Sequence, residues 1–224
     1  MLVSLDSVEL ENEIPGALEA KQARSLRLRD HYIREGIRCL NKQRLNQLRI
    51  SDLAKACGSS VGSFYTRFQD KESYFLSLRS ATVEICNQEA YYRVNVEKLY
   101  SMSGAQALDE MVDLMADIFT SPVRGVLRES LLRILEPDDP WAPMRDGARS
   151  IMRNYEVACA MMFPNFSPKE AKVRLRYCFQ LVVGALQNDL VNDYHVFSTK
   201  DQTLRTALKE TVRLYMGEAT KDVR

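Results

Sequence analysis

The distribution of helix-breaking residues constrains the fold of this 224-residue sequence more than any other feature. Only 7 prolines and 9 glycines occur, and they fall between stretches in which apolar residues recur at helical spacing. The sequence contains no β-branched runs with strand-like alternation, so we predict an all-α fold. The expected helices cover 22–43, 50–57, 60–67, a long segment from Lys71 that Asp70 caps, 103–120, 125–136, 141–163, 168–192 and a last segment from about 199.

The charge is distributed unevenly along the chain. The formal net charge is +1, but residues 1–20 carry −5, residues 21–80 carry +8 and residues 81–224 carry −2. A cationic segment joined to a slightly anionic remainder indicates that one part of the chain is suited to a polyanion.

Several classes of protein are not supported by the sequence. No apolar run reaches the roughly 20 residues that cross a bilayer, and the N-terminus lacks the basic region of a signal peptide, so we expect a cytoplasmic protein. The five cysteines show no metal-binding spacing, so we expect reduced thiols, no metal and no cofactor. A redox role for one cysteine stays open.

Residues 50–72 have the pattern of a helix, a tight turn and a second helix. Gly58 stands where the first helix must end in a left-handed conformation, which glycine adopts without strain. Ser59 or Ser60 can cap the second helix, and Phe64 and Phe68 point inward. A small outer face lets such a helix approach base edges in a major groove. That face consists of Ser60, Val61, Gly62, Ser63 and Thr66.

This segment resembles the N-terminal domain of TetR-family transcriptional regulators, which reads approximately D-I-A-x-x-A-G-V-S-x-G-[TS]-[LF]-Y-x-[HY]-F-x-[SN]-K-E. The motif covers about a tenth of the chain and is specific. The matching residues are Asp52, Ala54, Gly58, Ser60, Gly62, Ser63, Phe64, Tyr65, Phe68, Lys71 and Glu72. The resemblance implies an N-terminal three-helix domain with a helix-turn-helix in 21–75 and a C-terminal helical ligand-binding and dimerisation domain in 76–224. We expect the acidic residues 1–20 to form a disordered extension.

The resemblance also implies roles for individual residues. Tyr65 and Lys71 would hold DNA phosphates, and the small residues of the second helix would face bases or neighbouring phosphates. The full set of expected DNA-binding residues is Arg49, Ser51, Ser59, Ser60, Val61, Gly62, Ser63, Tyr65, Thr66, Arg67 and Lys71. Arg49 replaces the usual Ser or Thr cap of the first of these helices, and Arg67 replaces the usual His or Tyr. The basic residues 21–29 would be either a DNA-contacting arm or a solvated helix end.

The resemblance further implies a small-molecule effector and a homodimer. The candidate effector-lining residues are Met111, Met115, Trp141, Met152, Tyr155 and Gln187, although ordinary core packing also explains the methionines. Two helical stripes could pair with a second copy or could pack within their own domain. These stripes contain Val173, Tyr177, Leu181 and Ala185, and Leu204, Leu208 and Val212.

The function that these expectations describe is a repressor that binds double-stranded operator DNA and is released by a small molecule. An activator, or a DNA binder without a ligand, would share the same DNA contacts. A small-molecule-binding protein or an enzyme without DNA function is the alternative of another class. The only histidines, His31 and His195, belong to no catalytic or metal-binding pattern and are expected at the surface, so we expect no enzymatic activity.

Overall fold

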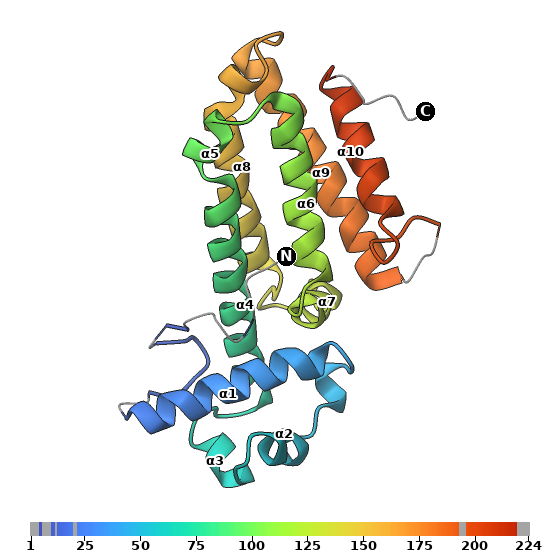
Figure 1. The fold of residues 1–224 in the computed structure, drawn as a ribbon. Helices are drawn as coiled ribbons and strands as arrows, with labels where there is room; N and C mark the ends of the chain where they lie inside the picture. Colours follow the sequence, from blue (N-terminus) through green and yellow to red (C-terminus); the bar gives the residue numbers. More distant parts are fainter. Residues whose placement is uncertain (1–4, 6–9, 12, 20–21, 193–195, 219–224) are drawn as a thin grey trace. The chain divides into compact units, whose positions relative to one another are not determined.

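The computed structural model describes residues 5, 10–11, 13–19, 22–192 and 196–218, and every regular element in this part of the chain is a helix (Figure 1). The all-α prediction is therefore confirmed for the described residues. The elements are α1 (Ala23–Leu40), η1 (Leu45–Gln47), α2 (Ile50–Ala56), α3 (Val61–Tyr65), α4 (Lys71–Val94), α5 (Val96–Tyr100), α6 (Gly104–Thr120), α7 (Arg124–Leu132), α8 (Ala142–Met162), α9 (Pro168–Asn192) and α10 (Thr203–Tyr215).

Several helices begin at the capping residues that the sequence predicts. At the start of α4, Asp70 Oδ1 accepts a hydrogen bond from the backbone N–H of Ser73 at 2.7 Å. At the start of α6, Ser103 Oγ accepts one from the backbone N–H of Gln106 at 3.3 Å. These side chains satisfy N–H groups that have no partner within the helix.

The helices differ from the prediction in several places. Helix α1 ends at Leu40 and not at 43, and α7 ends at Leu132 and not at 136. The short helix α5 was not expected, and it forms because Asn95 Oδ1 accepts a hydrogen bond from the backbone N–H of Lys98 at 3.0 Å. Helix α10 begins at Thr203 and not near residue 199. The residue before it, Gln202, has a left-handed backbone with φ of 68°, which a helix cannot include.

The chain divides into two compact units. Unit 1 consists of residues 1–86 and 121–144, and unit 2 consists of residues 87–120 and 145–224. Helix α7 thus belongs to the same unit as α1, against which it packs. The expected domain boundary after residue 75 remains a prediction.

An aromatic cluster forms the core of unit 1. Four rings are fully buried: Tyr32 of α1, Phe64 of α3, Phe68 of the α3–α4 connection and Tyr74 of α4. Their ring centroids lie 4.8 to 6.1 Å apart, mostly edge to face, which is the favourable arrangement of aromatic quadrupoles. The hydroxyl of Tyr74 donates to the backbone carbonyl of Tyr32 at 2.6 Å. The cluster therefore fixes α3 to both α1 and α4.

Two glycines allow α1 to be approached closely. A Cβ atom on Gly36 would lie 1.9 Å from the hydroxyl of Tyr74, and one on Gly125 of α7 would lie 2.3 Å from the carbonyl of Leu40. The backbone N–H of Gly125 donates to Asn41 Oδ1 at 2.8 Å. Only glycine leaves room for these contacts, so both positions are constrained by packing.

The described part of residues 1–20 packs against other residues of unit 1. Ile14 is buried, and the backbone N–H of Leu18 donates to the carbonyl of Arg67 at 2.6 Å. Gly16 makes the turn between them with φ of 84°. Buried apolar side chains and a glycine turn hold these described residues in place, and the disorder expected for the segment as a whole remains a prediction.

In unit 2, α6, α9 and α10 pack side by side (Figure 1). The apolar stripe predicted for α6 is buried, as are the apolar residues on the inner face of α9. The buried residues of the α6 stripe are Leu108, Met111, Val112, Met115 and Phe119.

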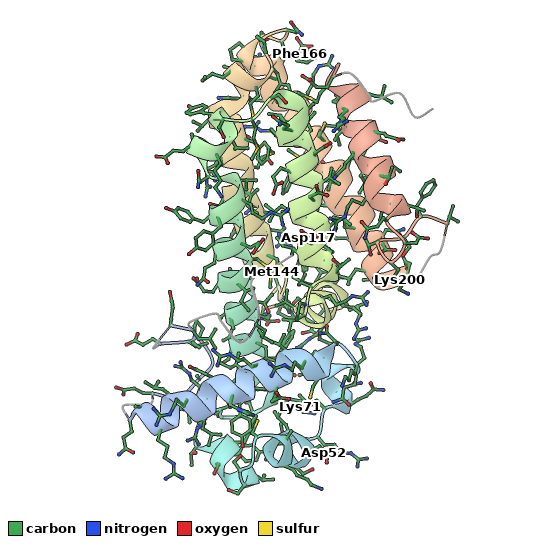
Figure 2. The ribbon with its side chains drawn as sticks, in the orientation of Figure 1. Asp52, Lys71, Asp117, Met144, Phe166 and Lys200 are labelled. Atoms are coloured by element: carbon green, nitrogen blue, oxygen red, sulfur yellow. The ribbon has the colours of Figure 1, made fainter. Side chains whose placement is uncertain are left out.

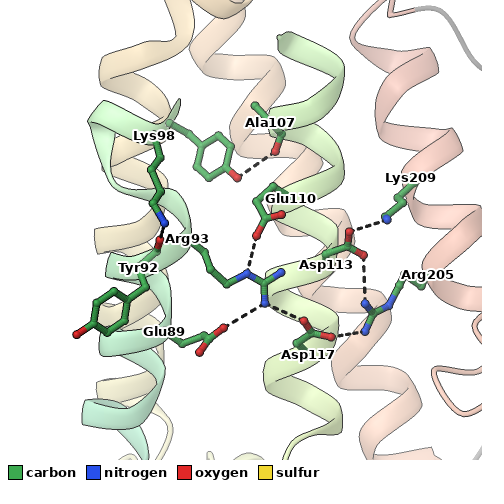
Figure 3. Close-up of polar contacts among 11 residues, drawn as sticks. Glu89, Tyr92, Arg93, Lys98, Ala107, Glu110, Asp113, Asp117, Arg205 and Lys209 are labelled. Atoms are coloured by element: carbon green, nitrogen blue, oxygen red, sulfur yellow. Dashed lines mark hydrogen bonds and ion pairs between the residues drawn. The ribbon is translucent and has the colours of Figure 1, made fainter. Parts of the chain in front are cut away.

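An ionic ladder joins α6 to α10, and Figure 3 shows its part around Asp113 and Asp117. It consists of three carboxylates spaced four residues apart on α6 and three cations with the same spacing on α10, which pair in antiparallel order. The pairs are Asp109 with Arg213, Asp113 with Lys209 and Arg205, and Asp117 with Arg205. We refer to these six residues as the α6–α10 ladder. The spacing of four keeps each set on one helix face.

Arg93 of α4 extends this ionic network to a third helix. Its guanidinium donates to Glu110 at 2.5 Å and to Asp117 at 2.7 Å (Figure 3). Burial alone would lower the pKa of Arg93, but the hydrogen bonds with these two carboxylates raise it above its usual value. The charge of Arg93 is thus fully compensated within unit 2.

Among the described helices, we find none that combines the length and the apolar character required of a bilayer-spanning segment.

Candidate nucleic-acid interface

The turn between α2 and α3 has the left-handed glycine that the sequence predicts. Gly58 has φ of 61°, and a Cβ atom there would meet nothing within 4 Å. The backbone N–H of Ser59 donates to the carbonyl of Ala54 at 2.9 Å, and that of Gly58 to Lys55 at 3.1 Å. These bonds close the C-terminal end of α2, so α3 starts in a fixed direction.

Of the two serines that could cap α3, the structure selects Ser60. Its Oγ accepts a hydrogen bond from the backbone N–H of Ser63 at 3.1 Å. Ser59 is half-buried, and its Oγ lies 2.5 Å from the hydroxyl of Tyr32. Ser59 therefore connects the turn to α1, and its expected contact with DNA remains a prediction.

The outer face of α3 is small and exposed. Val61 is 41% exposed, and Ser60, Gly62 and Thr66 are also exposed, whereas Ser63 is half-buried. A Cβ atom on Gly62 would meet only the side chain of Ser60, at 3.7 Å. The opposite face is closed by the fully buried ring of Phe64. A helix with this profile is narrow enough for its backbone to approach a groove floor.

Tyr65 and the start of α2 flank this face. The ring of Tyr65 is 51% exposed although it contacts Phe64 edge to face, so its position is defined by packing while its hydroxyl is accessible. Arg49 precedes α2 and makes no side-chain capping bond, and both Arg49 and Ser51 are exposed. Cationic and hydroxyl groups beside a slim helix can bind phosphates.

The N-terminus of α4 carries two opposite charges. They are Lys71, which is the first residue of α4 and is labelled in Figure 2, and Asp70, which precedes it. Lys71 is half-buried, and its Nζ lies 3.5 Å from the carbonyl of Asn46. The backbone hydrogen bond from Ser73 lowers the pKa of Asp70, so this carboxylate is charged at neutral pH. Asp70 therefore reduces the positive potential beside Lys71.

The structure separates the arginines of the basic segment 21–29. Arg29 is buried, and its guanidinium pairs with Asp30 at 2.6 Å, so it cannot reach a partner outside the chain. Arg24 and Arg27 are exposed on the other side of α1. The sequence pattern alone treated all three as equivalent, because their order along the chain does not show which side α1 buries.

The candidate effector-lining residues lie in both units. Trp141 belongs to unit 1 and is buried there, and Gln187 is half-buried on α9. In unit 2 the hydroxyl of Tyr155 donates to the carbonyl of Ala107 at 3.0 Å. The remaining candidates are buried in unit 2, and they are Met111, Met115 and Met152. An effector-binding role for these residues remains a prediction.

The two candidate dimer stripes differ in exposure. On α9, Val173 is 56% and Tyr177 51% exposed, while Leu181 and Ala185 are half-buried. The α10 stripe is buried within the chain, which agrees with packing in its own domain, and its contact with a second copy remains a prediction. Its residues, Leu204, Leu208 and Val212, are 8%, 4% and 1% exposed. Helical periodicity identified an apolar face of α10, but the packing of α10 on α6 and α9 already covers that face.

Four of the five cysteines have a thiol pKa that burial raises. Burial raises the pKa of Cys57 to about 12 and that of Cys178 to about 11, and it also raises the pKa of Cys39 and Cys159. At neutral pH these four side chains remain protonated, and the thiolate is the reactive form.

His31 is exposed, as expected, and His195 lies outside the described residues. Within the described ranges, no three His, Cys, Asp or Glu side chains are grouped so that they could hold a metal ion.

No protein-family model and no curated protein matches the sequence. Solved structures do match its fold. A Mesorhizobium loti protein assigned to the TetR family of transcriptional regulators has a TM-score of 0.65 and 13% identity, covering 88% of this chain and 98% of its own. A Rhodococcus protein assigned to the same family has a TM-score of 0.57 and 16% identity, covering 85% and 99%. GusR of Salmonella enterica has a TM-score of 0.58 and 14% identity, covering 88% and 100%. Over most of its length, this chain has the all-helical fold of TetR-family transcriptional regulators.

Proposed function

We propose that this protein is a transcriptional repressor that binds operator DNA as a homodimer and is released from it by a small molecule. The observation that carries the proposal is the slim, exposed face of α3, anchored from behind by the buried ring of Phe64. A helix without bulky outer side chains brings its backbone and small polar groups within reach of base edges.

The groups around α3 supply the second requirement, which is attachment to the DNA backbone. Tyr65 is exposed at the end of α3, Lys71 begins α4, and Arg49 precedes α2. Phosphate contacts of this kind fix the position of the helix on the duplex and contribute affinity without sequence preference. The hydroxyl groups of Ser60, Ser63 and Thr66 would then select the base sequence of the DNA.

A homodimer would place two copies of α3 about one helical turn of DNA apart, on a palindromic site. Because the α10 stripe is buried, we propose that the partner contacts the exposed row of α9, which includes Val173 and Tyr177. The ring of Tyr177 packs on Tyr215 of α10 with centroids 5.1 Å apart, and both rings are exposed. Val173→Glu would put a charge into this interface and should convert the dimer to a monomer in native mass spectrometry.

The DNA-binding part of the proposal is tested with duplex DNA from the region upstream of the protein's own gene. Binding is measured by fluorescence anisotropy over a series of salt concentrations, with a random duplex as competitor. We expect preference for the upstream DNA and a steep decrease of affinity with salt, because phosphate binding releases counterions. Equal affinity for both duplexes would overturn the proposal.

Tyr65→Ala should weaken binding about tenfold on every duplex, since it removes a hydrogen bond to a charged phosphate. The matched control is Tyr91→Ala, which removes a tyrosine that is 68% exposed in unit 2. Ser63→Ala should instead change the order of preference among duplexes. Release by an effector is tested by screening apolar small molecules for ligands that raise the melting temperature and reduce DNA binding.

A further inference from the structure

Unit 1 contains a basic hollow beside the first turns of α1. It has a volume of about 480 Å³ and is open to solvent. We call it the α1 hollow, and its lining residues are Gln22, Arg24, Ser25, Arg27, Leu28, His31, Gly58 and Arg67. Three of them are arginines, one is a histidine and none is acidic.

Arg67 is held in place by neutral acceptors. Its Nη1 donates to the carbonyl of Ser63 at 2.6 Å, and its Nη2 donates to Ser25 Oγ at 3.2 Å. No carboxylate among the described residues pairs with it, so its charge is positioned but not neutralised. A fixed cation of this kind is preorganised to bind an external anion, because its side chain loses little conformational entropy on binding.

Arg24 and Arg27 face the same hollow from α1. With Leu28 and His31 they follow the spacing i, i+3, i+4 and i+7, which places them on one side of the helix. Both arginines are exposed, and neither has a carboxylate partner in the described part of the chain. Arg29 differs because it is buried on another side of α1 and is paired with Asp30.

The start of α1 reinforces the positive potential. Its first turn contains no acidic residue, and the side chain of Gln22 makes no capping hydrogen bond. The positive end of the helix dipole is therefore not opposed locally, which favours an anion. Gly58 of the α2–α3 turn and Arg67 just after α3 line the same hollow, so the site borders the proposed reading helix at both of its ends.

We propose that the α1 hollow holds a backbone phosphate of the DNA outside the base pairs that α3 reads. This inference rests on the proposed function and extends the contact surface from α2, α3 and α4 to α1. A phosphodiester fits because it is a compact anion with several acceptor oxygens, and the hollow offers several donors without a competing carboxylate.

The test compares two double variants that remove the same charge from unit 1. Arg24→Gln with Arg27→Gln removes two cations of the hollow. Lys42→Gln with Arg124→Gln removes two cations at the other end of α1 and the start of α7, and these four side chains make no described ion pairs. Equal melting temperatures would show that both variants keep the fold.

We expect the hollow variant to bind upstream DNA about tenfold more weakly at moderate salt, with the slope of log affinity against log salt reduced by about 1 to 2. Hydroxyl-radical footprints should lose protection at the outer edges of the site and keep it in the centre. The ranking among duplexes should not change, because phosphates carry no sequence information. The control variant should keep the wild-type footprint and most of its slope.

Other outcomes overturn the inference in distinguishable ways. If the wild type prefers its upstream DNA and both variants behave alike, the hollow does not bind DNA but the proposed function stands. If the wild type shows no preference for that DNA, the proposed function and the inference about the α1 hollow are both wrong. If the hollow variant keeps its DNA slope but loses a melting-temperature increase that pyrophosphate gives the wild type, the hollow is a site for a free phosphate compound.

Discussion

The interactions that stabilise the interior of unit 1 differ from those that stabilise the interior of unit 2. Unit 1 depends on close packing, with four fully buried aromatic rings and two glycines where helices nearly touch α1. Unit 2 combines an apolar core with a row of ion pairs between α6 and α10 that is joined to α4 by Arg93. The side chains of these ion pairs are only 16% to 27% exposed.

The difference has consequences for how each unit responds to its surroundings. Aromatic packing depends little on salt or pH, so α3 should keep its position over a wide range of conditions. Partly buried ion pairs weaken when a carboxylate is protonated, and their more exposed members are screened by salt. Unit 1 also contains ion pairs, such as Arg44 with Glu129 at 2.6 Å, but those of unit 2 form one continuous network, so we expect the larger change of stability with pH and salt in unit 2.

The largest expected effect tests the packing of unit 1. Phe64→Ala should lower the free energy of unfolding by about 3 to 5 kcal/mol, because it empties the centre of the aromatic cluster. The measurement is urea unfolding followed by circular dichroism. Phe197→Ala is the matched control, since Phe197 is 53% exposed, and it should change stability by no more than about 0.5 kcal/mol. Equal costs for the two substitutions would contradict the assignment of Phe64 to the core.

An intermediate effect tests the ionic network of unit 2. Burial would raise the pKa of Asp117, but hydrogen bonds from Arg205 and Arg93 outweigh this and lower it. Asp117→Asn removes the charge that both arginines share and should cost about 2 kcal/mol at pH 7. Unfolding free energies at pH 7, 5, 4 and 3 provide the measurement.

The difference in unfolding free energy between the wild type and Asp117→Asn should change with pH in a definite direction. A carboxylate whose pKa is lowered in the folded state stabilises the protein at every pH above its unfolded-state pKa, which is about 3.9 for Asp. This stabilisation is lost as the pH falls through the folded-state pKa of the carboxylate. The gap between wild type and Asp117→Asn should therefore be constant from pH 7 to 5 and narrow below about pH 4. A gap that widens in acid would show that Asp117 does not stabilise unit 2 through its charge.

The smallest effect is expected at an exposed pair in the same unit. Asp146 and Arg149 lie 2.6 Å apart, but their side chains are 69% and 67% exposed. Asp146→Asn should change stability by no more than about 0.5 kcal/mol at any of these pH values, because solvent screens the pair. A cost comparable to that of Asp117→Asn would mean that burial is not what distinguishes the network around Arg93.

The α2–α3 region was predictable because it is specified by neighbouring residues. Gly58 ends α2 in the left-handed conformation, Ser60 caps α3, and Phe64 and Phe68 turn inward, all as the local pattern indicated. The α6–α10 ladder was missed, although the spacing of four on each helix is visible in the sequence. Its pairing could not be inferred, because the spacing does not tell which two helices are adjacent.

What the sequence by itself determined is every helix except α5, many of the helix ends and the slim face of α3, since these follow from backbone propensities and contacts within a few residues. Only the tertiary structure decided which helix faces remain exposed and can contact another molecule. It buried Leu204 while leaving Val173 exposed, and it paired Arg29 while leaving Arg24 free to line the α1 hollow. The physical reason is that burial and charge compensation depend on which distant segments come together, and helical periodicity shows only that a face exists.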